Sequence, residues 1–348
     1  VSRGLGDVYK RQNRLWGDFN YYTRDDKDQI ISVTSAPQSG YSTRKMNAGL
    51  IRNRGVELSL GGMPVSTKNW KWEMNFNIAK NSNKLVELAD GVDSYSIYWT
   101  SFTTRLYNYA MVGKSLGVIT GNTWERDDNG NIIFHELSAS QKALYGGEYV
   151  PTYNQNTLDE LGNFHPDFTG GFNTSISFKN FRLSANIDFS VGGQIVSYTN
   201  MWGSSSGILD KTAELNDRGV NVREPVSKGG GIHMTGVDQD GNKVDTYVNA
   251  KLYYTTASRV WEEWVYDRTY VKLREVSLSY VFPSQTLKKL NIGLSRASVA
   301  INASNPWLIY SACPNVDVSE IGMGYFEGGN AAATRSIGFT AVSYTHLT

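Results

Sequence analysis

The sequence has a single cysteine among 348 residues, so a disulfide framework is excluded. It has almost no net charge, because 34 Lys and Arg face 33 Asp and Glu. That balance argues against a general nucleic-acid binder and against a module for anionic membrane surfaces. No stretch reaches the roughly 18 to 20 apolar residues of a membrane-spanning helix. A membrane-spanning β-barrel stays open, since its strands alternate apolar and polar residues.

Helical periodicity is also scarce, and residues 211–218 are the best helix candidate. Disorder is excluded by the composition, because 40% of the residues are hydrophobic and the chain contains 21 Tyr and 9 Trp. Alternation with period two dominates instead. Between 181 and 191 the odd positions are apolar and the even ones polar, and 172–178 repeats this pattern before the two residues 179–180. We expect a β-hairpin there.

Further strands are predicted at 13–24, 56–60, 70–79, 117–125, 131–134, 270–282, 297–303 and 335–341. Several are near the 9 to 11 residues of a membrane-barrel strand, and longer than the 5 to 6 usual in soluble sandwiches. Arg182, Asn186 and Asp188 share the polar face of the strand 181–191, where a wet barrel lumen would suit them. Long irregular segments, at about 83–114, 136–169 and 195–268, alternate with tight connections, as in outer-membrane barrels.

The two ends of the sequence differ in kind from the segment between them. Residues 1–12 (VSRGLGDVYKRQ) and 342–348 (VSYTHLT) resemble translated sequencing adapters and show no targeting signal. We therefore expect both to be non-native extensions, with the biological segment at 13–341.

One block carries a specific family resemblance. Residues 264–283 (WVYDRTYVKLREVSLSYVFP) closely resemble a segment near the C-terminus of SusC/RagA-type TonB-linked outer-membrane transporters. Matching pieces occur in the same order at 13–30, 51–60, 165–195, 236–248 and 335–341. The sequence departs from the family pattern around Cys313 and lacks the usual aromatic residue at its terminal strand.

This resemblance implies the C-terminal part of a 22-stranded transmembrane antiparallel β-barrel, of which 13–341 would supply roughly 10 strands. The plug domain and the segment that contacts the TonB-ExbB-ExbD complex would lie outside this chain. The implied function is nutrient import, of oligosaccharides or peptides, across the outer membrane of a Gram-negative bacterium. A SusD-like surface lipoprotein would be the lid, and outer-membrane lipid would surround the barrel.

Catalytic, metal and cofactor sites are not expected. His135, His165, His233 and His346 share no ligand spacing. No Gly-x-Ser-x-Gly motif occurs, and Cys313 has no neighbouring His. Glu262 and Glu263 would point to opposite faces of a strand, which is wrong for an acid–base pair.

Two acidic strings resemble calcium loops but fit polar turns better. The string that begins at Asp238 lacks the required Gly and the terminal Glu of the calcium motif. The string from Asp127 ends in Asn-Gly, which predicts a type I′ turn.

Aromatic residues divide into two groups. Trp70 and Trp72 begin a strand and fit an interfacial girdle. A second group lies in or beside the long segments, where the rings could stack on sugars, contact a lid protein or only pack the loops: Tyr95, Tyr98, Trp99, Trp124, Tyr198 and Trp202. The sequence names no substrate-binding residue.

Three alternatives to the importer remain. A passive porin or adhesin barrel would lack a plug and a lid. A soluble carbohydrate-binding β-sandwich would use the loop tryptophans. An outer-membrane enzyme ranks last, because no nucleophile constellation is present.

Overall fold

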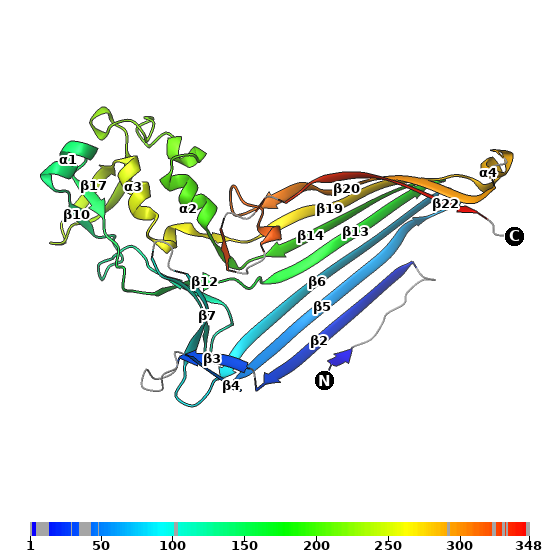
Figure 1. Cartoon of the computed structure of the whole chain (residues 1–348), viewed down its shortest axis with the longest axis horizontal. Helices are drawn as coiled ribbons and strands as arrows, with labels where there is room; N and C mark the ends of the chain where they lie inside the picture. Colours follow the sequence, from blue (N-terminus) through cyan, green and yellow to red (C-terminus); the bar gives the residue numbers. More distant parts are fainter. Residues whose placement is uncertain are drawn as a thin grey trace.

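The computed structural model describes residues 2–4, 14–28, 30–34, 43–47, 49–100, 104–290, 293–321, 325–328, 331 and 333–345. A nine-stranded antiparallel sheet is its main element (Figure 1). In spatial order the strands are β1 (Ser2–Gly4), β2 (Leu15–Lys27), β5 (Leu50–Ser66), β6 (Trp70–Glu87), β13 (Phe168–Phe178), β14 (Phe181–Val191), β19 (Tyr270–Val281), β20 (Leu294–Ser311) and β22 (Ser336–Thr345).

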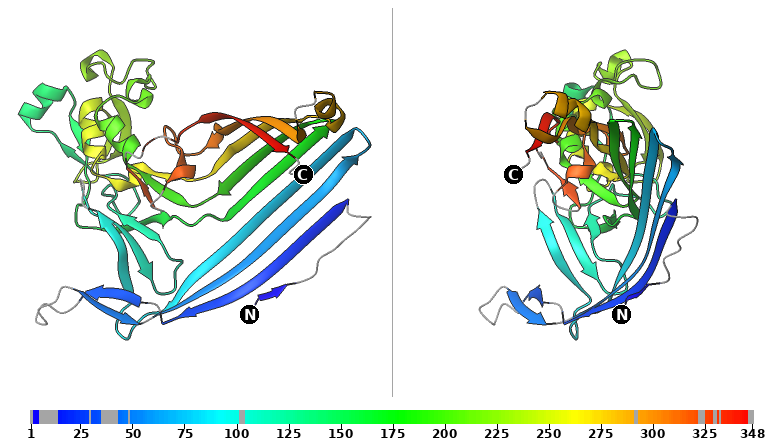
Figure 2. Two further views of the ribbon diagram at one scale, coloured as in Figure 1. Left: turned by 45° about the vertical axis from the view of Figure 1, so that its right-hand side comes forward. Right: turned by 90° about the vertical axis from the view of Figure 1, so that its right-hand side faces the viewer.

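The sheet is curved and open (Figure 2). Its edges, β1 and β22, do not pair with each other in the described part of the chain. Eight of its nine strands are 10 to 18 residues long, from β22 at the short end to β6 and β20 at the long end. The expectation of an all-β fold that forms part of a barrel is confirmed.

The two ends of the sheet differ sharply. At one end, β5 joins β6 through 67–69, β13 joins β14 through Lys179 and Asn180, and β19 joins β20 through α4 (Ser284–Leu290). At the other end the connections are long, at 28–49, 88–167, 192–269 and 312–335. This is the asymmetry of an outer-membrane barrel, which has short turns on one side and long loops on the other.

Three of the long connections fold together, and we call residues 88–167, 192–269 and 312–335 the loop region. Its core contains large buried side chains, among them Trp261, Trp264 and Met201. Its α-helices are α1 (Ala139–Tyr145), α2 (Tyr198–Ser205) and α3 (Ala250–Ala257). Its 3-10 helices are η2 (Asp210–Ala213), η3 (Val226–Lys228), η4 (Trp261–Trp264) and η5 (Val318–Glu320).

Small sheets complete the region. They contain β7 (Ser94–Thr100), β8 (Leu106–Met111), β9 (Val118–Gly121) and β12 (Asp159–Asn163); β10 (Phe134–Glu136) and β11 (Tyr149–Pro151); β15 (Gln194–Ser197), β18 (Val265–Asp267) and β21 (Phe326–Glu327); and β16 (Ile232–Val237) and β17 (Lys243–Val248). The connection 28–49 forms its own hairpin from β3 (Ile30–Thr34) and β4 (Thr43–Asn47).

The sequence predicted the large sheet better than the loop region. The hairpin around 179–180 is confirmed, with Lys179 at a φ of 51° in the turn. The predicted helix at 211–218 is wrong, because that stretch holds only the 3-10 helix η2. The segments 83–114, 136–169 and 195–268 were expected to be irregular, and this is wrong. They contain the end of β6, the strands β7, β8, β11, β12, β16, β17 and β18, and the helices α1, α2 and α3. Helices of about two turns bury too few residues to produce a recognisable 3.6-residue repeat of apolar positions in the sequence.

Both suspected extensions overlap strands. Residues 2–4 pair with β2, and 342–345 continue β22 along β20. The strand pairing shows where these residues lie and not whether they belong to the natural protein. The boundaries at 12/13 and 341/342 therefore stay a prediction. Among the described residues, no helix is long and apolar enough to cross a membrane.

Candidate functional site: the polar face of the large sheet

The large sheet has one apolar face and one polar face. The pairing registers show which residues of neighbouring strands lie side by side on each face. On one face, a single row runs through six strands and contains only apolar or aromatic residues: Trp72, Ile176, Leu183, Leu278, Ile301 and Phe339. Most of this row is open to the surroundings, with Phe339 at 69% relative exposure. An exposed apolar surface of this extent suits contact with lipid tails.

The opposite face is mainly polar along a row that passes through seven strands. Trp16 pairs with Gly61, and the row continues through Asn75, Asn173, Asn186, Glu275 and Ser304. A pocket of about 430 Å³ lies on this face, and Trp16, the three asparagines and Glu275 line it. The face therefore offers amide, carboxylate and indole groups to a polar solute or to another part of the protein.

Two aromatic side chains lie flat on this polar face because a glycine stands opposite each of them. A Cβ on Gly61 would lie 2.0 Å from Trp16 Nε1, and one on Gly55 would lie 2.3 Å from Tyr22 Cζ. Any larger residue would push the ring away from the wall. The hydroxyl of Tyr22 donates a hydrogen bond to Asn81 Oδ1 at 3.2 Å, which fixes this second ring over the polar face of β6.

Charged side chains frame the pocket towards the short-turn end. Arg182 Nη2 donates to Ser175 Oγ at 3.1 Å and lies 3.8 Å from Glu73 Oε2. Glu73 also pairs with Lys71 at 2.7 Å. Arg182, Asn186 and Asp188, which were expected on one polar face, do share it, but only Arg182 and Asn186 line the pocket.

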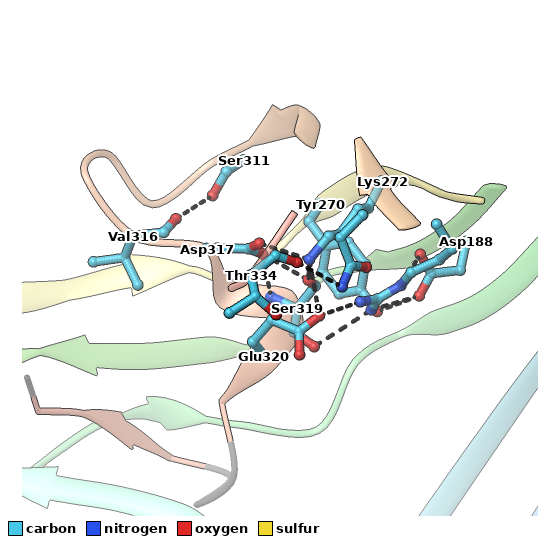
Figure 3. Close-up of polar contacts among 11 residues, drawn as sticks. Asp188, Tyr270, Lys272, Ser311, Val316, Asp317, Ser319, Glu320 and Thr334 are labelled. Atoms are coloured by element: carbon cyan, nitrogen blue, oxygen red, sulfur yellow. Dashed lines mark hydrogen bonds and ion pairs between the residues drawn. The ribbon is translucent and has the colours of Figure 1, made fainter. Parts of the chain in front are cut away.

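Asp188 belongs instead to a charged network at the loop end of the same face (Figure 3). A β-bulge makes this network possible, because the pairing passes from Glu275 opposite Asn186 to Leu273 opposite Ile187 and leaves Arg274 as the extra residue. Arg274 then forms a two-pronged ion pair with Asp188, at 2.8 and 2.9 Å. Tyr270 donates to the same carboxylate at 3.1 Å.

Lys272 is the centre of the network. Its side chain is only 2% exposed, and its Nζ donates to Asp317 Oδ2 at 2.7 Å, Glu320 Oε1 at 2.8 Å and Ser319 Oγ at 3.0 Å. Arg274 also contacts Glu320. The three acceptors sit on or beside η5, so a buried lysine on the sheet wall holds the β20–β22 connection in place.

The carboxyl groups of this connection are ionised more easily than usual. Burial raises the pKa of Asp317, but hydrogen bonds from Lys272 and Ser319 outweigh it and the pKa is lowered. Hydrogen bonds from Lys272 and Arg274 lower the pKa of Glu320, against a smaller effect of burial. Both groups are therefore anionic at neutral pH, as their ion pairs require.

The aromatic residues of the long segments are mostly structural. Trp124 and Tyr198 are buried in the core of the loop region, and Tyr198 stacks on Trp261 with ring centroids 5.1 Å apart. Tyr95 packs against a second small cluster. Tyr98 and Trp202 are exposed, at 41% and 42%, whereas the side chain of Trp99 lies outside the described residues.

The adjacent carboxylates Glu262 and Glu263 were expected on a strand, and this is wrong. They lie in the 3-10 helix η4 and converge on one residue, Trp124. Glu262 accepts from the backbone N of Trp124 at 3.1 Å and pairs with Arg126, while Glu263 accepts from the indole Nε1 at 2.6 Å. The pair anchors a buried tryptophan.

The two calcium-like strings are polar turns. Asp238 Oδ1 accepts from the backbone N of residues 240 and 242, and Asp127 Oδ1 accepts from 129 and 131. The type I′ turn expected at 129–130 is wrong, because φ is positive at Gly130 but not at Asn129. The turn is stabilised instead by the Asp127 carboxylate, which accepts hydrogen bonds from backbone N–H groups, so a second residue with positive φ is not needed.

The remaining candidates form no reactive cluster. Within the described residues, no three His, Cys, Asp or Glu side chains are placed to hold a metal ion, and His346 lies outside them. His135, His165 and His233 lie in different places, and burial lowers the pKa of His165. Cys313 is a buried free thiol whose pKa is raised by burial to about 12.

Trp70 and Trp72 lie at the short-turn end of the apolar face. Trp70 packs on Phe178 with ring centroids 4.3 Å apart, and Trp72 Nε1 donates to Thr174 Oγ1 at 2.9 Å. Half-exposed aromatic rings at one end of an apolar band match the girdle predicted from the sequence.

Known proteins resemble this chain in sequence and in fold. No protein-family model matches the chain. The TonB-dependent receptor P3 of Formosa agariphila is 27% identical over 349 residues, which cover 98% of this chain and 32% of that protein. The TonB-dependent receptor SusC of Bacteroides thetaiotaomicron is 30% identical over 191 residues, or 52% of this chain and 18% of that protein.

The fold agrees with these relatives. A solved structure of the RagAB peptide importer in a "closed-closed" state superposes with a TM-score of 0.66 at 18% identity, over 95% of this chain and 34% of that chain. This chain thus spans about a third of the length of the proteins it matches. The two-faced sheet, the short-turn and long-loop ends and the relatives agree: over about a third of their length, the chain is similar in sequence to TonB-dependent receptors, SusC among them, and in fold to the RagAB importer.

Proposed function

We propose that this chain forms part of the barrel wall and the surface loops of a TonB-dependent nutrient importer in the outer membrane of a Gram-negative bacterium. The observation that carries the proposal is the sheet itself, because strands of 10 to 18 residues separate a continuous apolar face from a continuous polar one. A sheet of this kind needs lipid on one side and an aqueous lumen on the other.

The solute would be an oligosaccharide or a peptide, and a SusD-like lipoprotein would cover the loop region. Support comes from the names of the relatives, which include SusC and a peptide importer. Regions outside this chain would supply the plug and the contact with the TonB-ExbB-ExbD complex. In this scheme the residues of this chain bind and orient, since the polar face offers hydrogen-bonding groups and η5 is held against the wall by Lys272.

The test compares energised with passive uptake. Cells that produce the full-length protein are given labelled oligosaccharides or labelled peptides, with and without a protonophore that collapses the inner-membrane gradient. An importer driven through TonB loses uptake when the gradient collapses. Uptake that persists unchanged would contradict the proposal and favour the passive porin.

A second measurement addresses the soluble alternative. After cell fractionation, the full-length protein is expected with the outer membrane and to need detergent for extraction. A soluble, detergent-independent monomer would contradict the proposal and favour a carbohydrate-binding sandwich.

A further inference from the structure

The loop region contains a groove away from the polar face of the large sheet. It lies among the C-terminal end of α1, the C-terminal end of α2 and the N-terminal end of α3, which gather at the end of the sheet remote from α4 (Figure 1). Its volume is about 460 Å³. Small-molecule sites span about 300 to 1,000 Å³, so the groove can hold part of an oligomeric solute.

The charge of the groove has one sign. Arg223 and Lys251 line it, and no Asp or Glu does. Lys251 is exposed and has no ion-pair partner among the described residues. It sits in the first turn of α3, where the helix dipole adds partial positive charge. An anionic group is therefore the ligand that this surface attracts.

Arg223 is held in place for such contact. Its Nε donates to the backbone oxygen of Thr212 at 2.8 Å, and its Nη2 contacts the Thr212 hydroxyl and the backbone oxygen of Gly207. These bonds leave the Nη1 amino group without a partner in the described part of the chain. A fixed guanidinium loses little conformational freedom when it binds a carboxylate.

A buried hydroxyl provides an independent observation. Ser204 lines the groove, is only 1% exposed, and its Oγ has no hydrogen-bond partner among the described residues. A buried hydroxyl without a partner costs about 1 to 3 kcal/mol, so such groups are rare unless a ligand or a water completes them. The hydroxyl lies enclosed behind the lining of the groove, where the described residues leave it unpaired.

The remaining wall is apolar. Leu144, at the end of α1, is 72% exposed, and Tyr145 beside it is half-buried. A leucine this open on a folded surface gains from an apolar or ring-shaped neighbour.

We propose that this groove binds a carboxylate-bearing solute, with the carboxylate between Arg223 and Lys251 and the adjoining unit against Leu144 and Tyr145. The inference rests on the proposed import function, for which the groove would be a capture site. The same carboxylate chemistry can come from a uronic-acid oligosaccharide or from an acidic peptide, and the experiment separates these two sources.

The test is calorimetric titration of the purified, detergent-solubilised full-length protein in 50 mM NaCl. The probes are trigalacturonate and its methyl ester, and the peptides Ala-Leu-Glu and the amide of Ala-Leu-Gln. We expect one of the two acidic probes to bind and its neutral partner to bind at least about tenfold more weakly. The acidic probe that binds identifies the source.

Variants locate the binding. Lys251→Glu should weaken the acidic probe about tenfold and keep the fold, because Glu is favourable in the first turn of a helix. Ser204→Ala should weaken it about threefold, since one hydrogen bond is lost. Lys228→Glu, a matched charge reversal on the exposed η3 outside the groove, should leave affinity unchanged.

Three results would overturn the inference: no binding of either acidic probe, equal binding of the neutral probes, or an equal effect of Lys251→Glu and Lys228→Glu. The proposed function fails separately, because protonophore-insensitive uptake would contradict import whatever the groove binds. Energised uptake of neutral solutes together with an empty groove would contradict this inference alone.

Discussion

The large sheet and the loop region use the same large side chains in opposite ways. In the sheet, Phe339 and Leu183 point outward and are 69% and 46% exposed, whereas Trp261 and Trp264 of the loop region are almost wholly buried. Water drives large apolar side chains into a core, as in the loop region, and would not leave the same kinds of side chain exposed on the sheet. The loop region thus folds around its own core, as water-soluble proteins do, while the sheet leaves its apolar face uncovered, as the proposed contact with lipid requires.

The largest effect is expected in the loop core. Trp261→Ala removes a side chain that is 0% exposed and stacks on Tyr198, so the loop region should lose about 3 to 5 kcal/mol of stability. Hydrogen exchange should speed up in the loop region and not in the sheet. Trp202→Ala, at an exposed tryptophan, should change stability by less than about 1 kcal/mol. Equal effects would break the distinction between core and surface.

The next effect separates the two faces of β14. Leu183→Arg places a charge on the apolar face and should cost about 2 to 4 kcal/mol of folding free energy in lipid vesicles. The neighbouring substitution Ser184→Arg points to the polar face, where little cost is expected. Urea unfolding in vesicles measures both. A penalty at Ser184 as large as that at Leu183 would contradict the assignment of faces.

A smaller effect concerns the contact between the two regions. Lys272→Met leaves Asp317 and Glu320 without their buried cation, and the attachment of η5 should weaken by about 1 to 3 kcal/mol. Proteolysis of the β20–β22 connection should become faster. Lys288→Met, at an exposed lysine of α4, is the control and should change nothing. Unchanged proteolysis in Lys272→Met would show that other contacts hold η5.

Acid should loosen the same attachment. The pKa values of Asp317 and Glu320 are lowered in the folded protein, so their contribution is complete above the unfolded values, near 4, and is lost as pH falls through the lower folded values. The protection of η5 against hydrogen exchange, measured relative to the core of β19 at the same pH, should be high at pH 7 and should fall as the pH drops below the unfolded values, near 4. Relative protection of η5 that is higher in acid than at pH 7 would contradict this sign.

The smallest expected effect is at Cys313. Burial raises the pKa of this thiol to about 12, so almost none is ionised at neutral pH. A maleimide reagent at pH 7 should leave the folded protein unlabelled and label it after denaturation. Rapid labelling of the folded protein would show that the β20–β22 connection is open.

How far the sequence predicts the structure differs between the two regions. Strict alternation from 181 to 191 predicted both the strand and its faces, because successive side chains of a strand point to opposite faces and each face has its own surroundings. The bulge at Arg274 left no signal, since an extra residue in one strand only shifts the parity of the residues beyond it. The convergence of Glu262 and Glu263 on Trp124 also left none, as it joins segments 138 and 139 residues apart. Contacts between residues far apart in the sequence determine both arrangements, and local sequence patterns do not record them.

The most direct test of the two-faced sheet uses single cysteines along β14. Because Cys313 is buried, a cysteine at each position from 182 to 190 would be the one accessible thiol in its variant. Spin labels at odd positions should be relaxed by oxygen, which concentrates in lipid, and those at even positions by a water-soluble nickel chelate. Alternation with period two in this phase supports a sheet between lipid and lumen. Equal exposure of all positions to the nickel chelate would contradict it.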